Sequence, residues 1–527
     1  MDLAAIQSAL RERNIDAWLF YDHHHRDPIA YRVLGVPASL MVTRRWFYLI
    51  PAEGEPVKLV HKIEAGHLDT LPGKKHQYSG WQELFDKLKA ILANYRDIAM
   101  QYSPNNIIFY VSLVDGGTID LVRGLGKNVV SSADLVAQFE STWSEDQIRS
   151  HFAARDSIDA IVAESFKEIG RRVRNGGTKE HEIQQWFIEA FRRESLLTDD
   201  PPIVAINANA GNPHYEPGPN HPTPIREGDV VLLDVWGKKN TPDAVYYDVT
   251  WMGFVGANPP ERMREIFEIV RDARDAGVKT VVDAVGAGRR IAGWEVDRAT
   301  RGHIKQKGYG DYFVHRTGHS IGTDVHSNGA NMDDLEIHDE RQILPNSCFS
   351  IEPGVYLPEF GVRSEVNVLV RAKSAEVTGK IQREIVTIRM ANSTTEKAKV
   401  ASTDQVSLMS VLAPAVGWLI PGAGHMIQKR WIRGGLLFVS IVTMFLLGLA
   451  MQGRIYHPNG GDILDILGFI GDLGAGGLYI VTLAMDWGQG VIAYATADYG
   501  TKFMIVAGLL NFISVADAYH IAIGKKQ

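Results

Sequence analysis

The sequence is poor in cysteine and has no apolar run at its start. Its single cysteine among 527 residues, Cys348, excludes an internal disulfide bond. The first 20 residues mix acidic, basic and apolar side chains, so we expect no secretory signal peptide. Basic residues are not in excess either. The formal net charge is −7, which gives no reason to expect a nucleic-acid partner.

The composition of the chain changes near residue 390. A chain of 527 residues is too long for one hydrophobic core, so several domains are expected. Residues 391–405 are small and polar, which is typical of a linker. Residues 406–427 and 434–453 contain no Asp, Glu, Lys or Arg, and the second run is long enough to span a bilayer. Two weaker apolar runs follow. We therefore predict an all-α transmembrane domain of three or four helices over 406–527.

A basic cluster separates the first two apolar runs: Lys429, Arg430 and Arg433. By the positive-inside rule this cluster should be cytoplasmic, and without a signal peptide residues 1–390 should be cytoplasmic too. The two expectations agree if 406–427, interrupted by Pro414 and Pro421, dips into the membrane without crossing it. If that run crosses, either the rule fails here or residues 1–390 lie outside.

Residues 1–390 divide into two parts by their hydrophobic pattern. Residues 1–140 alternate helical and strand-like stretches and predict an α/β domain. Residues 141–390 show a helix pair followed by strands, twice over, which predicts an α+β domain of two related halves whose sheets join. The first of these helices should begin with a capping box of Ser144 and Gln147 and extend to about residue 174.

Two aspartates interrupt apolar strand runs, Asp234 in VVLLDVW and Asp248 in VYYDVTW. An antiparallel hairpin centred on Thr241 would place them directly opposite each other on one face, with Cβ atoms ~5 Å apart. Two carboxylates that close repel each other unless a cation lies between them. The pair therefore indicates a cation site.

Two glutamates repeat this arrangement further along the chain. Glu352 in CFSIEPG and Glu365 in VRSEVNV bracket the turn LPEFG, and their midpoint falls between Pro358 and Glu359. A second hairpin would bring these carboxylates opposite each other too. Two acidic pairs, one from each half, suit a two-metal site, because bridging carboxylates hold two ions ~3.5–4 Å apart around one water.

The segment HRTGHSIGTDVH (315–326) contains three histidines. Its HxxxH spacing is that of a zinc-binding helix, but Arg316 stands where such a motif has glutamate, and Gly318 and Gly322 disfavour a helix. We predict strand, turn and loop here, with one histidine as a metal ligand. An oxygen-rich set with one imidazole and no thiolate suits Mn²⁺, and also Co²⁺, Fe²⁺ or Zn²⁺.

In order, DVW, DVT, HRTGHSIG, IEPGVY and GVRSE resemble the motifs of the pita-bread metallopeptidases. The resemblance is closest to the Xaa-Pro aminopeptidase and prolidase branch and covers about residues 1–390, with a creatinase-like N-terminal domain. It implies two divalent metal ions, with Mn²⁺ expected. Asp234 would bind one ion, while Asp248 and Glu365 would bridge both. His319 and Glu352 would bind the other ion, and Glu352 would also act as general base on the bridging water.

Further residues match the same family pattern: His214, His315, His326, Tyr356 and Arg363. The resemblance implies that His214 lines the substrate pocket and that His326 stabilises the tetrahedral intermediate. His315, Tyr356 and Arg363 would contact the substrate or support the ligands.

The chain departs from the family pattern at several positions. Ser364 and Val366 replace the Ile and Asp of RIED, and HSIG replaces HGIG. The first two ligands are 14 residues apart, which is wider than usual, so the hairpin turn carries an insertion. None of these changes removes a ligand, but they leave substrate preference and metal tuning open.

Residues 418–434, WLIPGAGHMIQKRWIRG, resemble a motif of bacterial multi-helix membrane segments that carries no known activity. We expect His425 in this motif to be structural.

Together these features predict a membrane-tethered dinuclear exopeptidase that cleaves the Xaa-Pro bond at peptide N-termini. The expected partners are a peptide with proline in second position, the membrane, and a second copy of the chain in a homodimer. Two alternatives are a non-catalytic binding scaffold on the same fold, and a prolidase-like hydrolase of dipeptides or other esters. The choice between dipeptidase and aminopeptidase stays open.

Overall fold

The computed structural model describes residues 1–220, 222–388, 408–457, 463–491 and 494–522. The chain forms two compact units, Met1–Asn392 and Ser393–Gln527, called unit 1 and unit 2 below. The predicted linker at 391–405 lies outside the described residues. A domain boundary near residue 140, within unit 1, stays a prediction.

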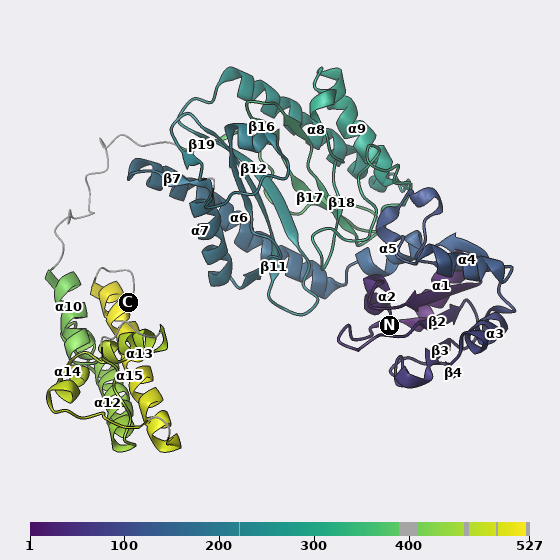
Figure 1. Cartoon of the computed structure of the whole chain (residues 1–527). Helices are drawn as coiled ribbons and strands as arrows, with labels where there is room; N and C mark the ends of the chain where they lie inside the picture. Colours follow the sequence, from purple (N-terminus) through teal and green to yellow (C-terminus); the bar gives the residue numbers. More distant parts are fainter. Residues whose placement is uncertain (221, 389–407, 458–462, 492–493, 523–527) are drawn as a thin grey trace. The chain divides into compact units, whose positions relative to one another are not determined.

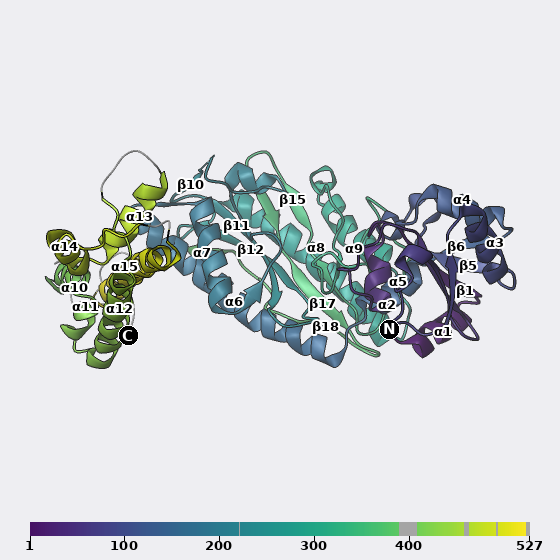
Figure 2. The same ribbon diagram turned by 60° about the horizontal axis from the view of Figure 1, so that its bottom comes forward.

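The N-terminal part of unit 1 is a six-stranded sheet with helices on both faces (Figures 1 and 2). The strand order is β4-β3-β2-β1-β5-β6. Every residue of β1 and β2 is buried, because separate apolar clusters cover the two faces. The strands are β1 (Ala17–Asp22), β2 (Trp46–Pro51), β3 (Val57–His61), β4 (Lys74–Tyr78), β5 (Asp97–Met100) and β6 (Asn128–Ser131). The helices are α1 (Leu3–Glu12), α2 (Pro28–Leu34), α3 (Trp81–Leu92), α4 (Gly116–Gly124) and α5 (Ala133–Ser141).

The first half of the following region packs two helices against an antiparallel sheet. The predicted capping box is confirmed: the Gln147 N–H donates to Ser144 Oγ (3.2 Å), and the Ser144 N–H donates to Gln147 Oε1 (2.9 Å). The helices are α6 (Glu145–Arg174) and α7 (Glu180–Arg193). The strands are β7 (Thr178–Lys179), β8 (Leu196–Leu197), β9 (Ile203–Ile206), β10 (Pro224–Ile225), β11 (Val230–Lys239) and β12 (Tyr247–Val255).

The second half repeats the order of a helix pair followed by strands, as predicted. Figure 1 shows the strands of both halves between the α6–α7 pair and the α8–α9 pair. The helices are α8 (Glu261–Gly286) and α9 (Gly293–Gln306). The strands are β13 (Ser320–Ile321), β14 (Cys348–Ile351), β15 (Gly354–Tyr356), β16 (Gly361–Arg363), β17 (Val366–Val370), β18 (Ala375–Val377) and β19 (Val386–Ile388). The last strand, β19, returns to pair with β12 of the first half.

Unit 2 is a bundle of helices. They are α10 (Leu408–Leu419), α11 (Ala423–Met426), α12 (Trp431–Ala450), α13 (Ile463–Gly474), α14 (Gly477–Ala484) and α15 (Ala495–Ala522). Among the described residues, α12 and α15 are long and apolar enough to cross a membrane, and the bent pair α13–α14 would make a third span. The expectation of three or four membrane helices is therefore met only if the bent pair counts as one span.

Candidate metal centre

The first carboxylate pair lies on the long hairpin of β11 and β12. Asp234 is opposite Thr250, and Asp248 is opposite Trp236. The two aspartates share one face, as predicted, but they are diagonal neighbours and not directly opposite each other. The prediction of a hairpin centred on Thr241 is therefore wrong by two positions of register.

Contacts outside the hairpin explain the shifted register. Lys238 and Lys239 at the end of β11 pair with β8, and the Tyr246 N–H donates to the Gly322 carbonyl (2.9 Å). Distant parts of unit 1 thus hold both arms of the connection. The strands do not close in a symmetric turn, which is what the midpoint argument assumes.

The second carboxylate pair lies where two short ladders meet. The pairing of β14 with β17 and the pairing of β15 with β16 have the same register. When this register is extended across the gap between the two ladders, Glu352 lies opposite Glu365. The hydrogen bond from the Ser364 N–H to the Pro353 carbonyl (3.2 Å) fits the same alignment. The predicted second hairpin is confirmed.

His319 precedes β13 in a segment of loop and short strand, as predicted. Its N–H donates to Ser350 Oγ (2.9 Å), and its carbonyl accepts from the Ser350 N–H (2.9 Å). A Cβ on Gly318 would stand 2.0 Å from the Ser350 carbonyl oxygen, so only glycine allows this close approach. These contacts fix the imidazole against β14.

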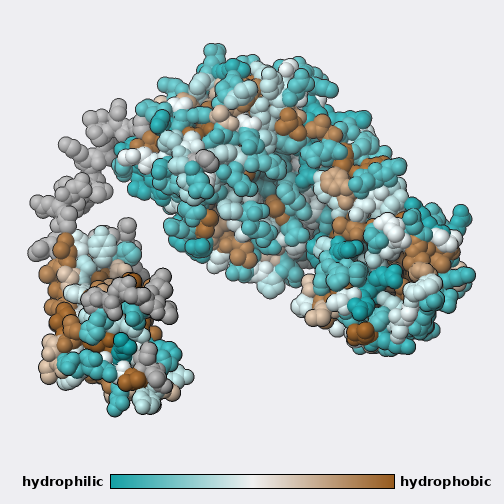
Figure 3. All heavy atoms as spheres, in the orientation of Figure 1, coloured by the Kyte–Doolittle hydropathy of each residue, from teal (hydrophilic) through white to brown (hydrophobic). Residues whose placement is uncertain are grey.

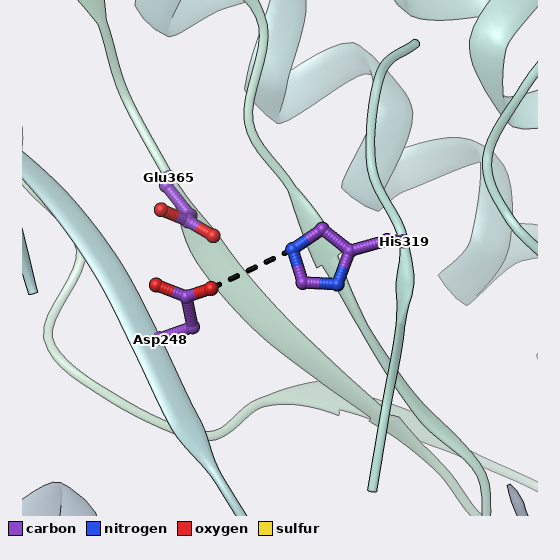
Figure 4. A group of neighbouring side chains, drawn as sticks. All are labelled: Asp248, His319 and Glu365. Atoms are coloured by element: carbon purple, nitrogen blue, oxygen red, sulfur yellow. Dashed lines mark ion pairs between the residues drawn. The ribbon is translucent and has the colours of Figure 1, made fainter. Parts of the chain in front are cut away.

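Three predicted ligands converge from different segments of the chain: Asp248, His319 and Glu365 (Figure 4). One ligand atom of each lies within 4.8 Å of the other two. His319 Nε2 is 3.5 Å from Asp248 Oδ2 and 3.4 Å from Glu352 Oε1. The two hairpins and the histidine segment therefore meet at one point.

This cluster is buried and carries unbalanced negative charge. Asp248 Oδ1 and Glu365 Oε1 are buried and accept no hydrogen bond from the described residues. Burial, and then repulsion by the other carboxylates, raises the pKa of both groups well above their ordinary values. Burial also lowers the pKa of His319 well below 6.5, so the ring is neutral and able to bind a metal. The donor set fits divalent cations placed between the carboxylates.

Arg363 links the ligands of the two halves. The residue is 4% exposed, and its guanidinium contacts Asp234. Arg363 Nε donates to Thr250 Oγ1 (3.0 Å), and this hydroxyl donates to Glu365 Oε2 (2.8 Å). The arginine thereby fixes Asp234 directly and Glu365 through Thr250.

His315 and Tyr356 form a pair beside Arg363. The Arg316 carbonyl can only accept, so His315 Nδ1 carries the proton in their 2.7 Å contact. His315 Nε2 therefore accepts from the Tyr356 hydroxyl (2.7 Å). Burial, followed by the charge of Arg363, lowers the pKa of His315 to about 3. The ring is neutral near pH 7 and holds the tyrosine hydroxyl in one orientation.

The remaining two histidines lie at the edge of the cluster. The His326 ring contacts that of His319 edge-on, with centroids 4.3 Å apart, and burial lowers the pKa of His326 to about 4. His214 is exposed and lies close enough to Asp234 and His326 to influence both groups electrostatically. The structure thus places His214 near the cluster without joining it to a ligand by a hydrogen bond among the described residues.

Two buried amides that hold β12 were missed by the sequence analysis. Asn367 Oδ1 accepts from the Asp248 N–H (2.9 Å), and Asn367 Nδ2 donates to the Asp248 carbonyl (2.7 Å). Gln382 makes the same two bonds to Met252 (2.8 and 2.6 Å). The available signal was an amide inside the apolar run VNVLV, since a buried amide needs partners. The partner of Asn367 lies 119 residues away and no local pattern identifies it.

Comparison with known proteins gives the family. The sequence profile of metallopeptidase family M24 matches residues 156–372, and that of a family of unknown function, DUF6677, matches residues 412–527. The Xaa-Pro dipeptidase of Pyrococcus furiosus is 34% identical over 255 residues, which are 48% of this chain and 67% of that protein. The chain belongs to metallopeptidase family M24. The Xaa-Pro dipeptidase of Lactobacillus delbrueckii subsp. lactis is 28% identical over 290 residues, 54% of this chain and 71% of that protein.

Two solved structures share the fold of this chain. Dipeptidase PepE from Mycobacterium ulcerans has a TM-score of 0.57 and 21% identity, covering 73% of this chain and 97% of that chain. Xaa-Pro dipeptidase from Bacillus anthracis has a TM-score of 0.51 and 21% identity, covering 73% of this chain and 98% of that chain. These likenesses show the mixed α/β pita-bread fold. Membership of M24 makes the protein a metallopeptidase and implies divalent metal ions.

Proposed function

We propose that unit 1 is a dinuclear metal-dependent exopeptidase that hydrolyses the Xaa-Pro bond at the N-terminus of a peptide. The observation that carries the proposal is the buried cluster of Asp248, His319 and Glu365, with Glu352 Oε1 3.4 Å from His319 Nε2. Relatives in the same family are named Xaa-Pro dipeptidase, which supports the choice of bond.

The proposed ligands divide between two metal ions. Asp234 would hold one ion, and Asp248 and Glu365 would bridge both. His319 and Glu352 would hold the other. Mn²⁺ is the preferred metal because four of the five donors are carboxylates and none is a thiolate. Bound there, the ions would lower the pKa of a water and polarise the scissile carbonyl.

Three residues of the chain would act on the reacting groups. Glu352 would take the proton of the attacking water, because burial raises its pKa to about 7, near the pH at which a general base works. The neutral His326 would donate a hydrogen bond to the oxyanion that develops on the carbonyl. The exposed His214 would contact the peptide where it enters.

Arg363 and Tyr356 would orient the reactants. Arg363 contacts Asp234 and reaches Glu365 through Thr250, so it keeps the carboxylates of both halves in place as charge shifts during the reaction. The Tyr356 hydroxyl, held by His315, lies 3.4 Å from Arg363 and would extend this support toward the substrate. A homodimer remains part of the prediction.

We further propose that unit 2 anchors the peptidase in a membrane. Both α12 and α15 have the length and composition of membrane spans. Large apolar side chains lie on the outside of the bundle, among them Leu436 (66% exposed), Val439 (61%) and Ile513 (66%). Figure 3 shows hydrophobic side chains gathered over the side of unit 2 where Figure 1 draws α10 and α14. Contact with lipid would bury this surface.

Metal analysis and peptide assays test the proposed activity. The purified protein should contain two divalent ions per chain, and it should hydrolyse an Xaa-Pro peptide but not the matching Xaa-Ala peptide. Chelation should abolish turnover, and Mn²⁺ should restore it. Absence of both metal and turnover would favour the binding scaffold. Hydrolysis of esters but not of peptides would favour the other alternative.

A further inference from the structure

Unit 2 contains two helices that stop inside the bundle. Both α10 and α13 have 12 residues, so each spans about 18 Å at 1.5 Å per residue, less than the ~30 Å of a bilayer core. After α13 the chain bends by 112° into α14. Helix α15 has 28 residues, and the residues of α15 that each short helix contacts show how far that helix extends into the bundle.

Helix α10 reaches the middle of α15, and the chain then turns back. At its end, the Trp418 carbonyl accepts from Asn511 Nδ2 (3.1 Å). Beyond Gly422, the chain has already returned, because Gln428 Nε2 donates to the Ala518 carbonyl (2.9 Å). Ala518 lies seven residues nearer the end of α15 than Asn511, so the chain has moved back by about 10 Å.

Helix α12 then starts at this same level and runs antiparallel to α15. Near its start, Arg433 forms an ion pair with Asp517 (2.7 Å). Near its end, a Cβ on Gly448 would lie 2.6 Å from the Gly500 carbonyl oxygen. The start of α12 and the end of α15 therefore share one end of the bundle.

Helix α10 extends from the level of Asn511, at Trp418, toward that end as well. A Cβ on Gly424, in α11, would stand 2.4 Å from the Ala413 carbonyl oxygen in α10 and 3.1 Å from the Ala518 Cβ. We call this end of the bundle the basic end, after its cluster of cationic residues: Lys429, Arg430 and Arg433.

The α13–α14 pair also enters the bundle and turns back, but it does so from the opposite end. Gly471 and Gly474 of α13 both pack against Gly508 in the middle of α15. After the bend, α14 leads back to Gly488, which packs against Ile455 just beyond the end of α12. This pair therefore enters and leaves at the end of the bundle away from the basic cluster.

The turning points of α10–α11 and α13–α14 meet inside the bundle. We call this contact the junction; its residues are Trp418, Leu473, Gly474, Gly476 and Asn511. Trp418 Nε1 donates to the Leu473 carbonyl (3.0 Å). The fully buried Asn511 donates through Nδ2 to the carbonyls of Trp418 and Gly474 (3.1 and 3.0 Å). The last carbonyls of a helix have no partner within the helix and are costly to leave bare in lipid. The junction supplies partners for both helix ends, which allows them to stop at mid-depth.

We propose that α10–α11 and α13–α14 are re-entrant segments that dip into the membrane from opposite faces, while α12 and α15 cross it. This inference rests on the proposed membrane anchor. It places the basic cluster, the entry of the chain from unit 1 and the end of α15 on one face. The positive-inside rule then makes that face cytoplasmic, and the peptidase cytoplasmic with it.

Site-directed cysteine labelling tests this topology on the full chain. The native Cys348 is fully buried, so it gives a low background with a membrane-impermeant maleimide. Ile432→Cys (83% exposed) reports the basic end, and Trp487→Cys (49% exposed) reports the opposite end. An N-terminal epitope, detected with antibody in intact spheroplasts and in inside-out vesicles, marks the face that carries unit 1.

The topology predicts a defined pattern of labelling. Ile432→Cys should react only in the preparation in which the epitope is accessible, and Trp487→Cys only in the other. Reaction of Ile432→Cys from the face opposite the epitope would mean that α10 crosses, and would overturn the proposal. Reaction of both cysteines in one preparation, with release of the chain by carbonate, would overturn the membrane anchor itself. Peptide turnover is measured separately, so a failed topology and a failed peptidase assignment are distinguishable.

Discussion

Glu352 and Glu365 lie on one hairpin, but their surroundings differ at the level of single atoms. Glu365 accepts a hydrogen bond from Thr250 Oγ1 (2.8 Å), and three other carboxylates raise its pKa well above the ordinary value after the effect of burial. Glu352 accepts a hydrogen bond from Ser350 Oγ (3.1 Å), and burial raises its pKa to about 7. Glu352 is therefore the carboxylate better suited to exchange a proton near neutral pH.

Replacing Glu352 by glutamine should remove proton transfer while preserving the shape of the side chain. We expect kcat on an Xaa-Pro peptide to fall by roughly 10²–10⁴-fold, the usual contribution of a general base. Glu359→Gln is the matched control, because that residue lies in the turn of the same hairpin with its side chain 44% exposed. Full activity of Glu352→Gln would contradict the assigned role.

His151 gives a prediction that does not depend on metal. The residue lies on α6 and is fully buried, with Nδ1 in contact with the Tyr246 carbonyl just before β12 (2.7 Å) and Nε2 in contact with Thr378 Oγ1 (2.8 Å). Burial lowers its pKa from 6.5 to about 4, so the unfolded chain binds the extra proton first as the pH falls. The contribution of His151 to the free energy of unfolding is fully present above pH 6.5, and it is lost progressively as the pH falls to about 4. The loss approaches about 3 kcal/mol at about 1.4 kcal/mol per pKa unit.

A His151→Gln variant should not show this loss of stability at acidic pH. Thermal unfolding at pH 7.5 and pH 4.5 should show a smaller drop in Tm for His151→Gln than for the native chain, while His76→Gln, at an exposed residue of β4, should behave like the native chain. Equal drops in all three proteins would contradict the prediction.

At the scale of whole elements, side-chain amides join the two halves of the catalytic region. Asn367 on β17 binds both backbone groups of Asp248 on β12, and Gln382 does the same for Met252. The Glu365 N–H reaches the Thr250 carbonyl between them (3.4 Å). These bonds pair the backbone groups at this edge of β12, in the way that a neighbouring strand would. They also set the separation between Asp248 and Glu365.

Asn367→Ala and Gln382→Ala separate stability from metal binding. Each variant leaves two buried backbone groups without partners, at about 1–3 kcal/mol for each group, so both should lower Tm. Only Asn367→Ala should also weaken Mn²⁺ binding, measured by calorimetry, because only Asn367 holds a proposed ligand. Equal metal affinity in the two variants would show that Asn367 has no role in placing Asp248.

In unit 2, the junction between the broken helices should tolerate no side chain at Gly476. That residue has φ +58, and a Cβ there would stand 1.7 Å from the Trp418 carbonyl oxygen. Gly476→Ala should therefore lower the Tm of the detergent-solubilised chain or prevent its accumulation in membranes. Gly435→Ala is the control, because a Cβ on this α12 residue meets no atom within 4 Å and alanine favours a helix. Similar loss in both variants would count against a tightly packed junction.

The register of the two hairpins shows what sequence can predict. The turn LPEFG closes locally, so counting from its midpoint gave the alignment of Glu352 with Glu365 correctly. The longer connection after Asp234 is held by β8 and by Gly322, which no count along the chain reveals. The motifs identified the ligand candidates. The amide of Asn367 and the meeting of α10 with α13 depend on residues far apart in sequence, and they required the structure.

At the scale of the whole molecule, the two units differ in what they need in order to fold. The two solved structures of similar fold each match 73% of this chain, and the match covers 97% and 98% of their own chains. Chains of that fold therefore form without a counterpart of unit 2. A chain ending at residue 392 should be recovered without detergent and should keep kcat/KM on a small soluble peptide within a few-fold of the full chain. Loss of activity in the soluble truncated chain would show that unit 2 contributes to catalysis.

The connection between β11 and β12 also bears on how this protein can change. Its tip, Thr241 to Asp243, is exposed, while the arms on either side are held by β8 and Gly322. Residues added at the tip would loop outward without shifting Asp234 or Asp248. An insertion acquired in evolution, an epitope or a fluorescent reporter should therefore be tolerated at this tip with little effect on catalysis.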